Sequence, residues 1–77
     1  MNKQRRNELK NAIVYIENVK DIIKEVKRKE EFAYDSLPEN LQYSNRGCDM
    51  EEKIDSMDEI IETIDDIISA INDVIFW

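Results

Sequence analysis

The apolar residues between positions 50 and 75 recur in alternating steps of four and three. The series is Met50, Ile54, Met57, Ile61, Ile64, Ile68, Ile71 and Ile75. This spacing fills the a and d positions of a heptad repeat, which is typical of a helix packed lengthwise against another helix. A further apolar column lies beside this seam at the g positions and consists of Ile60, Ile67 and Val74. We therefore expect an amphipathic helix over about residues 48–76.

A second heptad pattern precedes the first and predicts a helix over about residues 3–34. Its a positions hold Leu9, Ile16, Ile23 and Glu30, and its d positions hold Ala12, Val19, Val26 and Ala33. Ile13, Tyr15 and Ile22 widen the stripe on either side. Glu30 in the seam either pairs with Lys53 or Arg46, or stays hydrated near the end of the bundle.

The helical pattern pauses over the connector, residues 35–47. Pro38 lacks a backbone N–H and disfavours the helical conformation at Leu37, so the first helix should end near Tyr34. The sequence Ser36-Leu37-Pro38-Glu39 has the spacing of a capping box and predicts a short helical turn through Gln42. The connector residues expected to cover the end of the core are Leu37, Leu41 and Tyr43.

The start of the second helix has two interpretations. In the first, Gly47 marks the bend and Ser44 or Asp49 caps the helix. In the second, the helix begins as early as Pro38 and tolerates Gly47 at about 1 kcal/mol relative to Ala.

A connector this short predicts an all-α, antiparallel helical hairpin. The expected register places Ile16 on Ile71 and Ile23 on Ile64, with a slip of one heptad as the alternative. Each helix carries two apolar columns, which is more than one hairpin seam can cover. The columns left over contain Tyr15, Ile22, Ile60, Ile67 and Val74. We therefore expect two hairpins to pair into a four-helix bundle, with a monomer as the alternative.

The size and composition of the chain favour self-association over other ways of stabilising a small fold. A single domain of 77 residues has a thin core, and such chains usually need a disulfide, a metal or a second copy. Cys48 is the only cysteine and histidine is absent, so neither an internal disulfide nor a zinc site is expected. No cofactor, membrane span or signal-peptide pattern is expected, and the predicted location is the cytoplasm.

Charge is divided unevenly between the two helices. Residues 1–34 carry a net charge of +3 and residues 48–77 a net charge of −9. The predicted partner-binding face of the second helix consists of Asp55, Asp58, Glu59, Glu62, Asp65 and Asp66. The ordinary interpretation of such an acidic face is that it is only solvated, and a more specific interpretation is that it imitates the phosphate backbone of DNA. Direct nucleic-acid binding is not expected from so acidic a chain.

The connector also carries a resemblance to known proteins. Residues 30–42 read EEFAYDSLPENLQ and are followed by Ser44, Arg46 and Met50. This stretch resembles a family of small uncharacterised helical-hairpin proteins of bacterial phages and mobile elements, with Ser36 where Asn is usual in a DNLPENLQ pattern. The resemblance implies a hairpin and a bacterial host, and it supplies no catalytic residues.

Two functions follow as hypotheses. The first is a non-enzymatic protein that binds a host or phage protein through its acidic helix, for example as a phage-encoded inhibitor of host defence. The second is a structural or assembly protein that acts only through self-association. The ending Ile75-Phe76-Trp77 either contacts a partner or folds over the first helix near Leu9.

Overall fold

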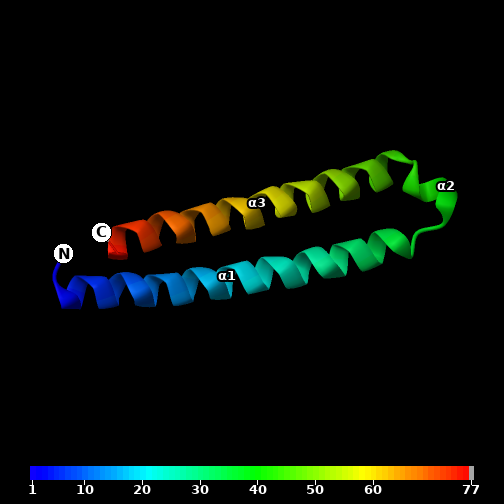
Figure 1. The fold of residues 1–77 in the computed structure, drawn as a ribbon. Helices are drawn as coiled ribbons and strands as arrows, with labels where there is room; N and C mark the ends of the chain where they lie inside the picture. Colours follow the sequence, from blue (N-terminus) through cyan, green and yellow to red (C-terminus); the bar gives the residue numbers. More distant parts are fainter. Residues whose placement is uncertain (77) are drawn as a thin grey trace.

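The computed structural model describes residues 1–76, which form an all-α hairpin (Figure 1). Helix α1 (Lys3–Asp35) and helix α3 (Asn45–Phe76) run antiparallel, and the short helix α2 (Glu39–Gln42) lies in the connector between them. The molecule is a rod with extents of 58 × 15 × 12 Å. The two ends of the chain lie together, opposite the connector (Figure 1). The predicted hairpin is therefore confirmed.

Local hydrogen bonds set the two ends of α1. At the start, the Arg5 backbone N–H donates to the Asn2 side chain at 2.8 Å, which satisfies one of the unpaired donors of the first turn. At the end, the Ser36 hydroxyl donates to the Phe32 carbonyl oxygen at 2.8 Å, before Pro38 prevents further helix. The predicted capping box is wrong, because Ser36 closes α1 and no side chain caps α2.

Helix α3 begins at Asn45, three residues earlier than predicted. Ser44 caps it as expected, since the Gly47 backbone N–H donates to the Ser44 hydroxyl at 3.3 Å. Gly47 does not mark a bend, because it lies buried inside the first turns of α3. A Cβ at this position would lie 2.1 Å from the Gln42 carbonyl oxygen. Glycine is therefore required for the close approach of α2.

The core between the long helices is thin. Within residues 1–76 the buried apolar side chains are Met50, Ile64 and Ile75, all from α3. On α1, the half-buried apolar side chains include Leu9, Ile16 and Ile23. The predicted seam of α3 therefore faces α1 as expected. Over the described residues, neither long helix is apolar enough along its length to cross a bilayer.

The seam of α1 is rotated relative to the prediction. Val19 and Val26 were expected to face α3, yet they remain 50% and 49% exposed. The side chains of Lys20 and Lys27 are only 20% and 24% exposed. The aliphatic stems of these lysines therefore cover the seam while their ammonium groups reach acids of α3.

The connector closes the hairpin through Gln42, which the sequence did not indicate. Leu37 is half-buried as predicted, but Leu41 is 43% and Tyr43 79% exposed, so these two do not cover the end of the core. Instead, the Gln42 side-chain amide donates to the carbonyl oxygens of Tyr34 and Leu37, both at 3.3 Å. These bonds join the end of α1 to α2.

Candidate interaction surfaces

One side of the hairpin, which we call the polar flank, carries a ladder of contacts between α1 and α3. Lys20 Nζ lies 2.5 Å from Asp65 Oδ1, and Lys27 Nζ lies 2.5 Å from Asp58 Oδ1. One heptad further on, the Tyr34 hydroxyl donates to the Glu51 carboxylate. In each pair the residue numbers add to 85, within two residues of the predicted register. A slip of one heptad would have moved every pair by seven residues.

Two of these contacts raise the pKa of the group that donates the hydrogen bond. The hydrogen bond from Lys27 to Asp58 raises the pKa of Lys27, against a smaller opposing effect of its loss of hydration. Donation to the Glu51 carboxylate, together with loss of hydration, raises the pKa of Tyr34 to about 12. Lys27 and Tyr34 therefore keep their protons well above neutral pH, and their contacts with Asp58 and Glu51 persist there.

The opposite side of the hairpin is apolar. Lys20 and Lys27 lie on one side of the α1 seam, and the exposed apolar column of α1 lies on the other. In α3, Asp58 and Asp65 likewise lie across the seam from the column of Ile60, Ile67 and Val74. Because the lysines and aspartates meet on the polar flank, the two apolar columns share the other flank. This apolar face consists of Tyr15, Val19, Ile22, Val26, Ile60, Ile67 and Val74.

The residues of the apolar face are well exposed to solvent. Tyr15 is 72% and Ile22 64% exposed, and the other five are between 44% and 50% exposed. All five residues predicted for self-association lie on this face. The sequence reasoning missed Val19 and Val26, which it had placed in the hairpin core. On α3 a shallow depression borders Ile60 and Ile67 and is lined in addition by Ser56, Glu59, Thr63 and Ile64.

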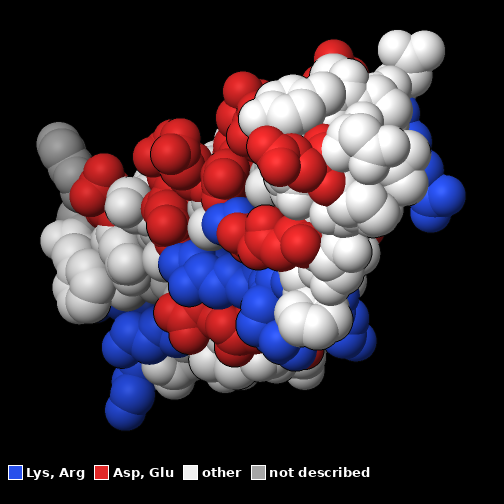
Figure 2. All heavy atoms as spheres, turned by 90° about the vertical axis from the view of Figure 1, so that its right-hand side faces the viewer, with Lys and Arg blue, Asp and Glu red and all other residues white. Residues whose placement is uncertain are grey.

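The predicted acidic face divides into two sets of residues. Asp58 and Asp65 are bound to lysines of α1 in the polar flank. The other four form an acidic ridge of exposed residues along α3, and they are Asp55, Glu59, Glu62 and Asp66. Within residues 1–76 no ion pair involves the ridge. Seen from the connector end, acidic side chains gather over α3 and a basic band runs beneath them (Figure 2).

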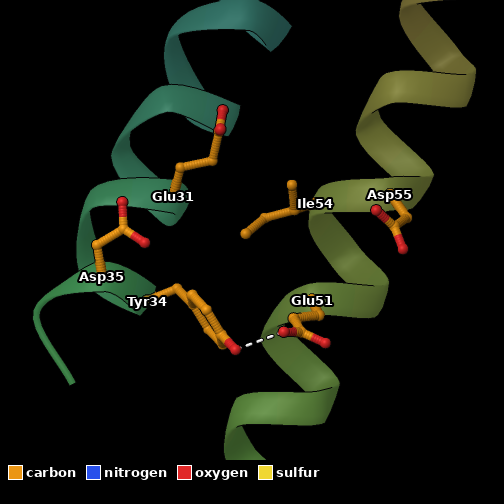
Figure 3. Close-up of a pocket in the computed structure, with 6 residues that line it drawn as sticks. All are labelled: Glu31, Tyr34, Asp35, Glu51, Ile54 and Asp55. Carbon is orange, nitrogen blue, oxygen red and sulfur yellow. Dashed lines mark hydrogen bonds between the residues drawn. The ribbon is translucent and has the colours of Figure 1, made fainter. Parts of the chain in front are cut away.

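A cleft with four carboxylates lies between the long helices near the connector (Figure 3). It is lined by Glu31, Tyr34, Asp35, Glu51, Ile54 and Asp55. The carboxylates do not converge on one point, and Glu51 accepts the Tyr34 hydrogen bond (Figure 3). No group of three potential metal ligands occurs in the described part of the chain.

Glu30, Cys48, Ile75 and Phe76 are not part of these surfaces. Glu30 is half-buried and makes no ion pair within the described chain, where Lys53 pairs with Asp49 at 2.9 Å instead. Cys48 is an exposed free thiol. At the C-terminal end, Ile75 is buried and Phe76 is 79% exposed, while the prediction for Trp77 lies outside the described residues.

No family model, curated protein or solved structure matches this chain. The resemblance of its connector to small helical-hairpin proteins of phages and mobile elements therefore stays a prediction.

Proposed function

We propose that this chain is a non-enzymatic protein–protein interaction protein, in which two hairpins pair through their apolar faces into a four-helix bundle. The single observation that carries the proposal is the apolar face, whose seven large side chains remain 44–72% exposed on one flank. Contiguous apolar surface of this kind marks interaction sites in soluble proteins. The thin hairpin core supports the same conclusion, because small helical domains commonly gain stability by oligomerisation.

In such a bundle the acidic ridge remains outside and is the surface offered to a partner. Its four carboxylates have no cation from their own chain within residues 1–76, so they are available to a basic protein surface. Asp58 and Asp65 are excluded from this role because α1 already binds them. If the connector resemblance holds, the partner is a host or phage protein, and inhibition of a host defence nuclease fits a small acidic binder.

Removing the charge of the ridge tests this role. We would immobilise the protein, expose it to a bacterial extract, and compare the retained proteins with those retained by a variant carrying Asp55→Asn, Glu59→Gln, Glu62→Gln and Asp66→Asn. The matched control neutralises four exposed acids elsewhere, namely Glu8, Glu17, Asp21 and Glu39. The proposal expects a basic protein that binds the wild type and the control and is lost from the ridge variant. Equal retention by all three chains would contradict it.

A structural or assembly protein is the second candidate, and the breadth of the apolar face favours it. In that case self-association is the whole function, and the ridge only keeps the assembly soluble. The two candidates differ in one result. Neutralising the ridge leaves the assembly and its biological effect intact in the structural case, and abolishes partner binding in the first.

A further inference from the structure

We infer that the second copy packs on the apolar face in one defined orientation, with both connectors at the same end of the bundle and α1 of each copy on α3 of the other. This inference rests on the proposed dimer and specifies its geometry. Two identical hairpins related by a twofold axis meet face to face in two ways. An axis along the rod places α1 on the partner's α3. An axis across the rod places α1 on α1 and α3 on α3, with the connectors at opposite ends.

Charge favours the axis along the rod. Helix α1 contains nine basic and seven acidic residues, whereas α3 contains two basic and ten acidic residues. Placing α3 against a second α3 brings two strongly negative helices together. Placing α1 against α3 repeats between copies the complementarity that already pairs Lys20 with Asp65 and Lys27 with Asp58 within each chain.

Side-chain size favours the same orientation. A twofold axis along the rod leaves the position of every residue along the rod, its level, unchanged. The register of the polar flank within one chain therefore also applies between the two copies. The most exposed residues, Tyr15 and Ile22, then lie opposite the small residues Ala70 and Thr63 of the other chain, which are exposed on α3. To within one residue of this register, the remaining levels pair Ala12 with Val74, Val19 with Ile67, Val26 with Ile60, and Lys29 with Ser56.

The alternative axis gives a less even match. An axis through the level of Val19 and Ile67 places Tyr15 on Ile22 and Thr63 on Ala70. Two bulky side chains then meet at one level, and two small ones leave a gap at another. Close-packed interfaces are made where large residues face small ones, so this orientation fills space poorly.

Cysteine cross-linking between two labelled chains tests the orientation. Cys48 is first replaced by Ser, and Val19→Cys and Ile67→Cys are made in separate chains, one of which carries a size tag. The two chains are mixed by unfolding and refolding and then oxidised. We expect disulfide-linked dimers only between unlike chains, because facing positions bring the cysteines within bonding reach. Ala12→Cys with Val74→Cys is a second pair at another level.

The outcomes separate the orientation from the dimer itself. Disulfides between two copies of the same variant would overturn the orientation and leave the proposed dimer standing. A dimeric mass with no disulfide between unlike chains, for either pair of positions, would do the same. Monomeric mass of the wild-type chain would overturn both.

A measurement on the native thiol gives the same distinction without altering the interface. Cys48 is exposed near the connector, so spin labels on the wild-type chain report the separation of the two connector ends. A helix with its side chains is about 10–12 Å across, so in the proposed orientation the labels are separated only by the width of the bundle, below about 30 Å. In the alternative orientation the labels lie about 55 Å apart, because each is some eighteen helical residues from the axis at about 1.5 Å per residue. A distance near the larger value would overturn the inference.

Discussion

Replacing Ile67 by Glu should separate the two hairpins while leaving each one folded. Ile67 lies at the centre of the α3 column and is 44% exposed in the hairpin, so nearly half of its surface is left for a second copy to cover. Full burial of an aliphatic side chain is worth about 1.5–3 kcal/mol, so covering the exposed part contributes about 1 kcal/mol per copy. Losing about 2 kcal/mol per dimer weakens association about 30-fold. Desolvation of two new carboxylates adds to this loss.

Sedimentation equilibrium over a range of concentrations measures the effect as a shift in the dissociation constant. The matched control is Ser69→Glu, which adds the same charge two residues further along α3 at an exposed position off the apolar face. Circular dichroism checks that both variants keep the helix content of the wild type. We expect the control to associate nearly as the wild type does. Equal dissociation constants for Ile67→Glu and Ser69→Glu would refute the reasoning, because the apolar face would then make no contact.

Three further predictions concern the hairpin itself. Gly47→Ala should lower the free energy of unfolding by about 1–3 kcal/mol, because the new Cβ meets the Gln42 carbonyl oxygen. In an unhindered helix the same substitution would raise the free energy of unfolding by about 1 kcal/mol, so urea unfolding of the variant distinguishes the two cases. A titration followed at 295 nm should show one tyrosine with a pKa of about 12 that is missing from the Tyr34→Phe variant, and a Tyr34 pKa near 10 would contradict the Glu51 contact. Because the pKa values of Tyr34 and Lys27 are raised in the folded state, both groups stabilise the fold below pH 10, and stability should fall as pH rises from 10 toward 12. Asp58→Asn should lower the thermal midpoint more than Asp55→Asn, because Asp58 alone of the two binds Lys27, and equal midpoints would argue against the polar flank.

The periodicity of apolar residues was sufficient to predict the hairpin and the core side of α3. Steps of four and three from Met50 to Ile75 leave one face of that helix for a partner, and α1 occupies it. Pro38 likewise indicated the end of α1 correctly to within one residue, because its ring excludes a helical conformation before it. These features depend on residues close together in the sequence.

The features that the sequence reasoning missed depend on contacts between distant segments. A hydrophobic pattern places Val19 inward and Lys20 outward, but in the structure Lys20 lies over the seam, where it binds an acid 45 residues away, and Val19 lies on the apolar face. The spacing of Lys20 and Lys27, seven residues apart like Asp58 and Asp65, is the signal that was available. Gly47 was predicted to mark a bend, because the sequence alone does not show that the Gln42 carbonyl oxygen approaches it closely.

The molar mass of the wild-type chain in solution tests most directly whether a second copy covers the apolar face. One chain has a mass of 9.2 kDa. Light scattering coupled to size exclusion should give twice this value at micromolar concentrations and a decline toward one chain on dilution. A mass of 9.2 kDa that persists up to several hundred micromolar, with Tyr15 accessible to a soluble quencher, would contradict the account.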